Sequence, residues 1–200
     1  MIFFTSDAHF LDYDTIVNDN RPFKLVKECD NFLIKTWNKQ AGKNDTIYFI
    51  GDFVNCDGEN STSWQKSINY VKRIKAQVVL IIGNNEQRVI KYFFNDNFNL
   101  FKQFCIDVGF KDVLTSCEID VENYHFNLVH KPKDCKKGML NLFGHMHRSG
   151  GLYKPFGFNI GCDLNFFRLY SQKDILHLIY MKNTYWDKDK NLHLTNLDGV

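Results

Sequence analysis

The sequence predicts an α/β fold in which two sheets pack face to face with helices outside them. Three observations support this prediction. Short apolar runs alternate with helical patterns up to about residue 107, strand-like runs follow one another from about residue 112, and five of the apolar runs end in residue types that bind metals. Because a helix or a sheet buries its apolar face against another layer, this order favours two layered sheets flanked by helices.

Strands and helices alternate in the first half of the chain. Residues 25–40 repeat apolar side chains at helical spacing, and Ser61 is placed to cap a second helix that runs to about residue 75. Helical segments are expected to fill residues 86–107. Short apolar runs predict three strands, at residues 1–7, 46–51 and 77–82.

The second half of the chain reads mostly as strands. Ser171 opens a capping pattern that includes Asp174 and predicts the start of a last helix. The tail at 182–200 is polar, and no structure is predicted for it. A chain of 200 residues suits one domain, which we expect to span residues 1–200. The predicted strands lie at residues 112–119, 123–129, 139–143 and 157–161.

Composition and charge argue against several classes of function. A net charge of +2 is too small to indicate binding to nucleic acid or to an anionic membrane. No apolar stretch is long enough for a membrane-spanning helix, and the N-terminus lacks the basic region of a signal peptide. The six cysteines form no Cys-x-x-Cys pair, which argues against a thiolate zinc site and fits reduced thiols in a cytoplasm.

Seven side chains able to bind metals follow five of the apolar runs. Open α/β sheets bind their ligands at the carboxyl ends of the strands, so we expect these side chains to converge on one place. Together they suffice to hold two divalent metal ions and indicate metal-assisted hydrolysis. The seven residues are Asp7, His9, Asp52, Asn84, His130, His145 and His147.

The spacing of these residues predicts how they converge. Asp7 and His9 are two positions apart at a strand end, so both side chains are expected on one face, and His145 and His147 repeat the spacing. Asp52 follows a glycine that permits a close backbone approach, so its carboxylate could bridge two ions. Carboxylates beside imidazoles suit manganese, iron, cobalt or zinc.

Each of these signals alone has a plainer explanation, since Gly-Asp occurs in many turns and a single Asp-x-His is weak support for a site. The complete set, in order and each after a strand-like run, argues against chance. The other histidines serve as a comparison. His125 lies five residues before His130 and should face the opposite side of its strand, His177 falls in the last helix, and His193 lies in the tail. We expect these three to be structural or solvated.

The full set of motifs resembles the calcineurin-like metallophosphoesterase superfamily. The resemblance rests on Asp7-x-His9, Gly51-Asp52, Gly83-Asn84-Asn85-Glu86, His130 and Gly144-His145-x-His147. Five segments resemble its small bacterial and phage members, and the likeness extends from residue 1 to about residue 178. These segments are Thr5-Ser6-Asp7-Ala8-His9-Phe10, Arg21-Pro22-Phe23 with Asp45-Thr46-Ile47-Tyr48 and Gly51-Asp52-Phe53, and Asn159-Ile160-Gly161-Cys162-Asp163.

This resemblance implies an α/β/β/α sandwich of two mixed sheets flanked by helices, with a two-metal centre. Two ions about 3.5–4 Å apart can ionise a bridging water and hold the phosphoryl oxygens during in-line attack. We expect two divalent ions, manganese first, with iron, zinc, cobalt, nickel and magnesium as alternatives. The resemblance assigns one ion to Asp7, His9, Asp52 and His147, and the other to Asp52, Asn84, His130 and His145, with Asp52 bridging.

The chain departs from the family pattern at two places. Position 85 is Asn where the pattern has His, which usually contacts the phosphate and helps to protonate the leaving group. Asn85 can hydrogen-bond a phosphoryl oxygen but cannot deliver a proton, so either the protein works without this acid or the histidine was replaced. Leu11-Asp12 stands where Gly-His usually follows, so any substrate contact from that histidine is absent.

Three residues are candidates for binding the substrate: Asn84, Asn85 and Arg21. Arg21 could bind a phosphate through two donors, or it could be an ordinary arginine of a surface loop. The lysine run at 131–137 directly follows His130, so it could line the rim of the site and attract an anion, or be a solvated loop.

We therefore expect a cytoplasmic, dinuclear metal-dependent phosphoesterase, in a bacterial cell or encoded by a phage and acting in the host cytoplasm. Asp52 and Asn85 are the residues expected to act in catalysis. The expected substrate is a small phosphate ester, a nucleotide or related molecule, and both diester and monoester hydrolysis stay open, as does the oligomeric state. The alternative is a weakly active or inactive binding module of the same fold, which Asn85 alone favours. A nuclease would need a more basic surface.

Overall fold

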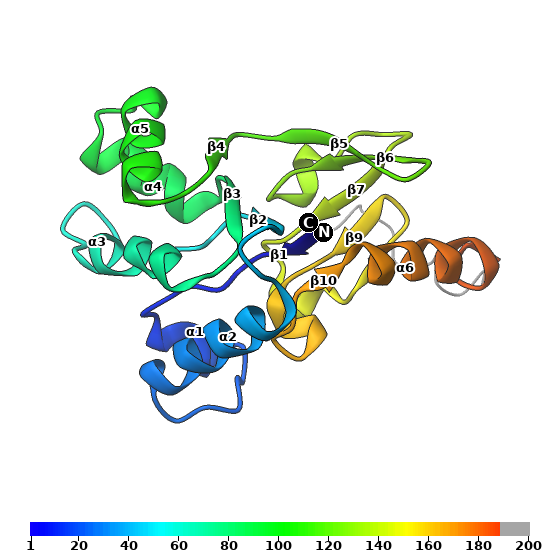
Figure 1. Cartoon of the computed structure of the whole chain (residues 1–200), viewed down its shortest axis with the longest axis horizontal. Coiled ribbons are helices and arrows are strands. Elements are labelled where there is room, and N and C mark those ends of the chain that lie inside the picture. The colour runs from blue at the N-terminus through cyan, green and yellow to red at the C-terminus, as the bar shows by residue number, and fades with distance from the viewer. Residues whose placement is uncertain (189–200) are drawn as a thin grey trace.

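Two five-stranded sheets form the centre of the protein (Figure 1). The computed structural model describes residues 1–188. In the first sheet, β1, β2, β3 and β4 run parallel and β10 pairs antiparallel with β1, in the order β10-β1-β2-β3-β4. The strands are β1 (Ile2–Thr5), β2 (Thr46–Ile50), β3 (Gln77–Ile81), β4 (Asp112–Leu114) and β10 (Tyr170–Ser171).

The second sheet is also mixed. Its central strands β6, β7 and β9 are parallel, while β5 and β8 pair antiparallel at its two edges, in the order β5-β6-β7-β9-β8. The expected architecture of two mixed sheets with flanking helices is therefore confirmed. The strands are β5 (Cys117–Val121), β6 (Tyr124–Leu128), β7 (Leu140–Phe143), β8 (Tyr153–Lys154) and β9 (Gly157–Asn159).

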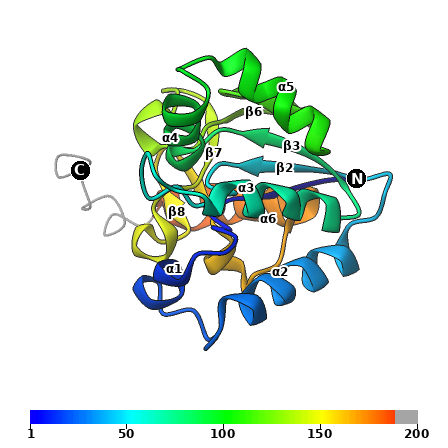
Figure 2. The same cartoon turned by 90° about the vertical axis from the view of Figure 1, so that its left-hand side faces the viewer.

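Helices gather on one side of the first sheet, in front of β2 and β3 in Figure 2. Five of them precede β4, and the sixth follows β10. None of the helices within residues 1–188 is long and apolar enough to cross a membrane. They are α1 (Tyr13–Asn18), α2 (Val26–Gln40), α3 (Ser63–Ser67), α4 (Asn84–Phe93), α5 (Phe98–Val108) and α6 (Gln172–Thr184), with short 3-10 turns η1 (Ile68–Arg73), η2 (Pro132–Asp134), η3 (His147–Gly150), η4 (Cys162–Asn165) and η5 (Trp186–Lys188).

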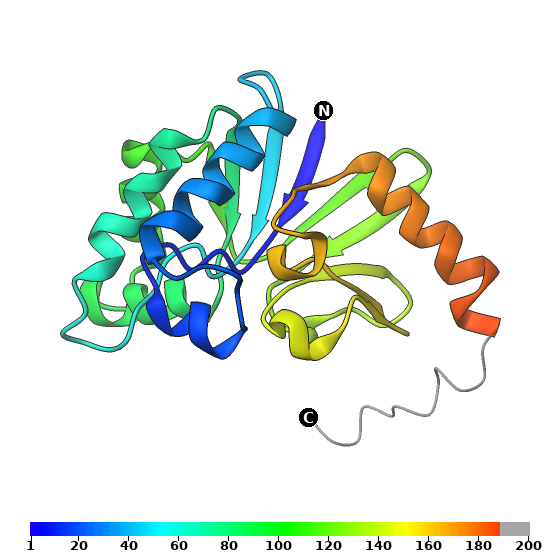
Figure 3. The ribbon, with the colours of Figure 1, turned by 90° about the horizontal axis from the view of Figure 1, so that it is seen from below.

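The strands of the first sheet are buried on both faces, which explains why they read as continuous apolar runs. Phe49 packs toward the helices, where its ring lies 4.9 Å from that of Phe53 and 5.9 Å from that of Trp37. The neighbouring residue Ile50 faces the second sheet and shares a core with Phe126. This second core also takes in the apolar face of α6, which lies beside the second sheet in Figure 3.

Several elements differ from the sequence-based expectations. The predicted strand at 112–119 divides into β4 and β5, which belong to different sheets, because the chain crosses between them at residues 115–116. The helix expected from Ser61 begins after Thr62 and continues as η1 beyond Ser67. Three short elements, α1, β8 and β10, were not predicted, because they are too short to show a periodic pattern.

The last helix begins as predicted. The Ser171 hydroxyl and the Asp174 carboxylate cap α6 reciprocally, and the helix continues to Thr184. The predicted polar tail at 182–200 thus starts within α6 and η5, while residues 189–200, including His193, lie outside the described residues.

The carboxyl edges of the two sheets meet. Ser6, just after β1, forms a parallel bridge with Gly161, just after β9, and the Cys162 amide donates to the Ser6 carbonyl at 3.1 Å. Within the second sheet, the Gly144 amide donates to the His130 carbonyl at 3.0 Å and aligns the ends of β6 and β7. The loops that follow β1, β2, β3, β6 and β7 therefore lie at one place.

Candidate metal centre

Two groups of metal-binding side chains lie where the sheet edges meet. In each group, every residue offers one ligand atom, and these atoms lie within 4.8 Å of one another. The remaining predicted residue, Asn84, has its Oδ1 atom 3.1 Å from His130 Nε2. All seven sequence-predicted residues are thus together. The first group contains Asp7, His9 and His147, and the second contains Asp52, His130 and His145.

Asp52 lies between the two groups. Its Oδ2 atom is 3.5 Å from His9 Nε2 in the first group and 3.5 Å from His130 Nε2 in its own. Two nitrogen or oxygen ligands about 2.1 Å from a tetrahedral ion are roughly 3.4 Å apart, so these separations suit atoms that share an ion. The arrangement fits a carboxylate that bridges two ions.

The backbone is left-handed at five of the seven residues. The φ angles are positive at Asp7 (58°), His9 (50°), Asp52 (54°), His145 (71°) and His147 (44°). Residues other than glycine adopt such angles uncommonly, and strained backbone persists where function and tertiary contacts impose it. The expectation from strand alternation was therefore wrong: β1 ends at residue 5 and β7 at residue 143, and left-handed turns beyond them make the side chains converge.

His9 has a buried ring whose nitrogens make no hydrogen bond within residues 1–188. Nε2 faces Asp52, while Nδ1 lies 3.5 Å from Asp12 Oδ2. Because an unpaired buried polar atom costs about 1–3 kcal/mol, a metal ion at Nε2 fits this imidazole.

Close packing fixes the orientation of Asp7. Its carboxylate accepts hydrogen bonds from the Ser6 hydroxyl at 2.6 Å and from the His145 amide at 3.0 Å. A Cβ atom at Gly144 would lie 2.6 Å from Asp7 Oδ2, so the chain can pass this closely only with glycine there. Ser6 is a supporting residue that the sequence analysis did not single out.

Glu86 organises the loops that hold Asp52 and Asn84. Its carboxylate is fully buried and accepts four backbone N–H groups: those of Asp52 (2.9 Å), Phe53 (2.9 Å), Val54 (3.1 Å) and Gly83 (2.7 Å). In the sequence, Glu86 was noted only as part of a motif. Glu86 lies three residues after Gly83, the N-cap of α4. This spacing is typical of a capping box and is the local signal that could have predicted hydrogen bonds from Glu86 to backbone N–H groups.

Arg21 is placed differently from the expected substrate contact. The side chain is buried, and its guanidinium forms two hydrogen bonds with Asp163, at 2.8 and 2.9 Å. It also donates to the carbonyl oxygens of Asp7 at 2.7 Å and Ala8 at 2.8 Å. With its donors used in this way, Arg21 holds the loop after β1 in place and is not free to bind a phosphate.

Two carboxylates face the outer nitrogen of His147. Its Nδ1 atom lies 2.9 Å from Asp19 Oδ2 and 3.7 Å from Asp163 Oδ2, while its Nε2 atom lies 3.8 Å from Asp7 Oδ1. Carboxylates that contact one nitrogen of a histidine orient the other nitrogen toward a metal. Neither Asp19 nor Asp163 was predicted as a site residue, because both come from loops distant in sequence from His147's motif; Asp163 was noted only as part of the segment 159–163.

Asn85 is turned into the protein at the start of α4. Its side-chain oxygen accepts from the Cys56 amide at 3.1 Å, and its own backbone N–H donates to Asp52 Oδ1 at 2.9 Å. The exposed side chain of Arg88 lies nearby, with Nη1 3.5 Å from Asn85 Oδ1. Arg88 is a cationic group beside the centre that the sequence analysis did not consider.

Neighbouring carboxylates and imidazoles in the centre shift the pKa values of one another, so that the charged form is favoured at His130, His147 and Asp52. Burial acts to lower the pKa of His130, but the neighbouring Asp52 carboxylate outweighs it and raises the pKa to about 9. Burial likewise acts to lower the pKa of His147, but the Asp163 and Asp19 carboxylates outweigh it and raise the pKa to about 10. The pKa of Asp52 is lowered, since His130 and His9 outweigh its burial. A metal ion would take the place of these imidazole protons.

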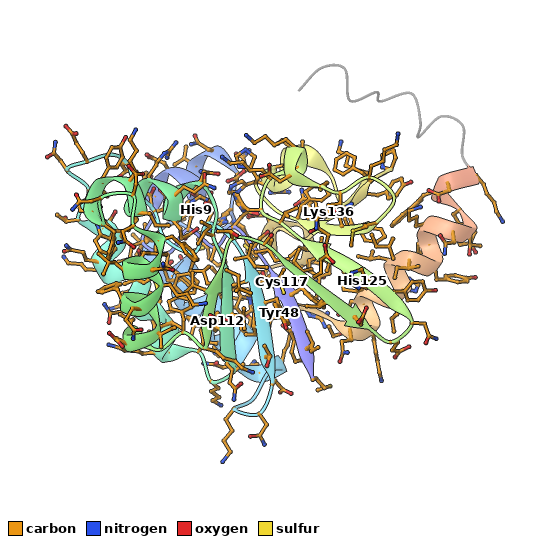
Figure 4. The ribbon with its side chains drawn as sticks, turned by 90° about the horizontal axis from the view of Figure 1, so that it is seen from above. His9, Tyr48, Asp112, Cys117, His125 and Lys136 are labelled. Carbon is orange, nitrogen blue, oxygen red and sulfur yellow. The ribbon has the colours of Figure 1, made fainter. Side chains whose placement is uncertain are left out.

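Two of the comparison histidines lie away from the centre, as expected. His125 is exposed and pairs with Asp120 at 2.6 Å and Glu118 at 3.0 Å, and Figure 4 shows it well separated from His9. His177 lies in α6, where its ring stacks 6.2 Å from that of Tyr180. Within the lysine run, Lys131 and Lys136 line a hollow that His130 also lines.

Comparisons with known proteins identify the family of this chain. Residues 1–159 match the family model described as calcineurin-like phosphoesterase. A protein of Methanocaldococcus jannaschii described as uncharacterized protein MJ1445 is 32% identical over 96 residues, which cover 46% of this chain and 52% of that protein. The chain therefore spans about half the length of this curated relative.

Among solved structures, a protein of unknown function from Aquifex aeolicus, AQ665, aligns with a TM-score of 0.60 and 17% identity, over 89% of this chain and 98% of that one. The nuclease MPE of Pseudomonas putida aligns with a TM-score of 0.40, at 16% identity over 73% of this chain and 61% of that one. Yfce, a phosphoesterase from E. coli, aligns with a TM-score of 0.39, at 15% identity over 80% and 77%. The family model covers well over half of the sequence, and the chain belongs to the calcineurin-like phosphoesterase family.

Proposed function

We propose that this chain is a dinuclear metal-dependent hydrolase of small phosphate esters, with nucleotides as the preferred class. The observation that carries the proposal is the position of Asp52, whose Oδ2 atom is 3.5 Å from an imidazole nitrogen on either side. The buried ring of His9, whose nitrogens make no hydrogen bond within residues 1–188, also supports it. We assign Asp7, His9, Asp52 and His147 to one ion and Asp52, Asn84, His130 and His145 to the other.

Two divalent ions, manganese in our proposal, would supply the Lewis acidity that lowers the pKa of water and neutralises the phosphoryl group. The protein orients the ligands: Ser6 fixes Asp7, Glu86 fixes the loop of Asp52, and Asp19 faces the outer nitrogen of His147. His145 is exposed, whereas Asp52 and His130 are buried. A substrate would therefore approach the centre from the side of His145.

The chain offers no proton donor at position 85. Asn85 can bind a phosphoryl oxygen only through its amide, whose oxygen is already used by the Cys56 amide. Protonation of the leaving group is therefore left to water, and esters with acidic leaving groups should react fastest. We propose a cytoplasmic location, in a bacterial cell or in the host of a phage, which the six free cysteines support.

The test combines metal content with a panel of substrates. Protein reconstituted with manganese should contain about two ions per chain and hydrolyse nitrophenyl phosphate monoesters or diesters and nucleotide esters. Asp52→Ala should lose both ions and the activity, whereas His125→Ala, at an exposed position outside the centre, should keep both. A metal content near zero under saturating manganese would overturn the proposal.

The second candidate function is a metal-binding module without robust activity. Asn85, in the place of the family's histidine, is the observation that favours it. Two bound ions without hydrolysis of any ester in the panel would support this candidate, because the centre would then be intact and the chemistry absent.

A further inference from the structure

A hollow of about 430 Å³ lies at the amino ends of β7 and β9. The metal-binding residues His145 and His147 follow the opposite, carboxyl end of β7. A strand rises about 3.3 Å per residue, so the four residues of β7 separate the hollow from that end of the sheet by roughly 10 Å. We name it the Asn141 hollow, after the side chain that ties its walls together, and define it by Lys136, Lys137, Met139, Leu140, Phe156 and Lys182.

A single buried amide holds three walls of the Asn141 hollow in position. Asn141 is completely buried, and its Nδ2 atom lies 3.0 Å from the carbonyl oxygens of Lys136 and Met139. The same atom lies 2.6 Å from the carbonyl oxygen of Phe156, while Asn141 Oδ1 accepts from the Lys136 amide at 2.8 Å. Because these bonds fix the loop before β7 against the turn before β9, the hollow is preformed.

The half-buried side chains of the Asn141 hollow are largely apolar: Met139, Leu140 and Phe156. Leu140 packs against the core that the second sheet shares with α6, and the Phe156 ring lies 5.3 Å from that of Phe143. These contacts keep an apolar surface in a fixed place, where an aromatic ring or a short carbon chain can cover it. An inorganic anion in the hollow would leave this surface in contact with water.

Three lysines line the same hollow, and within residues 1–188 no carboxylate lines it. Lys136 pairs with Glu118, and Lys182 pairs with Asp187, so both lysines have partners outside the lining. Lys137 is exposed and forms no ion pair within the described part of the chain. Since ion pairs close to the surface are weak, an anion in the hollow can compete for Lys136 as well as bind Lys137.

We propose that the Asn141 hollow binds a small organic anion, in which a carboxylate, sulfonate or phosphate group is attached to an aromatic ring or a short carbon chain. The anionic group would pair with Lys137 and Lys136, and the carbon part would cover Met139 and Phe156. The volume of the hollow suits a small ligand, since such sites measure about 300–1,000 Å³. The site needs no metal ion, so a chain without manganese binding or hydrolysis would refute the proposed function and leave this inference standing.

The test must separate this site from the metal centre, because Lys136 also lines the smaller hollow beside His130. Figure 4 shows Lys136 apart from His9. The probe is 1-anilinonaphthalene-8-sulfonate, which joins a sulfonate to aromatic rings, and the full chain is titrated with it by fluorescence and calorimetry, with and without manganese. One probe molecule per chain should bind with the same affinity in both forms.

Inorganic sulfate serves as the comparison ligand for the same titrations. It should bind at least about 10-fold more weakly than the probe, because it has no apolar part to bury. Sulfate that binds as tightly as the probe would overturn the assignment of an organic anion. Probe binding that requires manganese, or that inorganic phosphate abolishes and sulfate does not, would place the probe at the metal centre and overturn the inference.

Charge reversal tests the location of the bound anion. Lys137→Glu replaces an attraction by a repulsion in the hollow and should weaken probe binding about 10-fold. Lys133→Glu makes the same change at an exposed lysine of the same loop that does not line the hollow, so at about 0.15 M salt its effect should be small. Equal affinities in Lys137→Glu and the unsubstituted protein, or equal losses in the two variants, would overturn the inference.

A pair of methionine variants tests the apolar wall. Met139→Gln puts a polar amide of similar length into the wall and should weaken probe binding several-fold. Met181→Gln makes the same change at a half-buried methionine of α6 that does not line the hollow, and it should leave the affinity unchanged. Melting temperatures of both variants show that the fold is kept. Equal probe affinities in the two variants would mean that Met139 does not contact the ligand, and would overturn the assignment of this wall.

Discussion

Asn85 stands where the sequence pattern that this chain resembles has a histidine. It is almost completely buried, and its side-chain oxygen is held by the Cys56 amide at 3.1 Å. General acid catalysis contributes about 10²–10⁴-fold, and most of that benefit falls on poor leaving groups. At the scale of single residues, Asn85 should therefore set which esters this chain can hydrolyse.

We expect Asn85→His to increase the rate far more for a nucleotide ester, whose leaving group is an alkoxide, than for a nitrophenyl ester. The gain should decline at pH values above the histidine pKa, because only the protonated ring can act as an acid. Steady-state rates on both substrates across pH provide the measurement. Equal gains on the two esters would mean that position 85 binds phosphate and transfers no proton.

Asp30 makes a separate, pH-dependent contribution to stability. It is buried in α2, where it accepts from the Leu11 amide at 3.3 Å, and burial raises its pKa to about 6. A carboxyl whose pKa is raised on folding stabilises the protein while protonated, so this contribution is present below about pH 4 and is lost as pH rises through about 6.

Asp30→Asn removes this titration and keeps the amide acceptor. Between pH 4 and pH 7, the free energy of unfolding of the unsubstituted protein should fall relative to that of the variant by on the order of 2 kcal/mol, since each pKa unit corresponds to about 1.4 kcal/mol. Urea denaturation of the metal-free proteins measures the difference. Asp107→Asn, at an exposed site in α5, is the control, and parallel pH profiles for the Asp30→Asn and unsubstituted proteins would refute the assignment.

At the scale of elements, the first turn of α4 is the structural centre of the site. Asn84 and Asn85 occupy its first two positions, and Glu86 ties it to the loop after β2 through Asp52 and Val54. A Cβ atom at Gly83 would lie 2.2 Å from Asp52 Oδ1, so the two loops touch through a residue without a side chain. The helix start and the bridging carboxylate therefore form one unit.

Glu86→Gln should loosen this unit. Each carboxylate oxygen accepts two backbone N–H groups, and an amide nitrogen in place of either oxygen cannot accept, so two hydrogen bonds are lost whichever way the amide turns. We expect a loss of about 3 kcal/mol in the free energy of unfolding and weaker manganese binding. Chemical denaturation and calorimetry measure the two effects.

The exposed Glu28 in α2 offers a matched control for that variant. Glu28→Gln makes the same chemical change where the carboxylate accepts only the Lys24 amide, at 3.3 Å, so stability should change little. If Glu86→Gln were as stable as Glu28→Gln, the four short contacts would not hold the loops together as described.

At the scale of the whole molecule, the centre joins the two sheets. The first metal group combines residues after β1 with His147 from the loop after β7, and the second combines Asp52 after β2 with His130 after β6. Each ion would therefore connect loops from both sheets. Metal binding should accordingly stabilise the folded chain as a whole.

We expect manganese to raise the melting temperature of the protein. A ligand at about 100 times its Kd adds about 2.7 kcal/mol per site to the free energy of unfolding. Differential scanning calorimetry should show the increase for the unsubstituted protein and for His125→Ala, and little of it for Asp52→Ala. An equal increase in Asp52→Ala would place the bound manganese elsewhere.

The sequence by itself determined the parts of this protein that local patterns encode. Apolar runs such as 46–51 and 77–82 identified the buried strands, because a strand buried on both faces needs apolar side chains throughout. The polar residues after those runs identified the members of the candidate centre, since parallel strands bring their carboxyl ends to one edge. The capping pattern at Ser171 identified the start of α6.

Only the tertiary structure decided how those residues are held. Arg21 and Asp163 are separated by 142 positions, so no local pattern could show that they pair and that the arginine holds the loop after β1. The left-handed turns at Asp7 and His145 depend on packing between the sheets, and the division of residues 112–119 between two sheets depends on which neighbour each half meets. Local sequence encodes periodicity and chemical type, whereas side-chain direction and partner choice arise from contacts between distant segments.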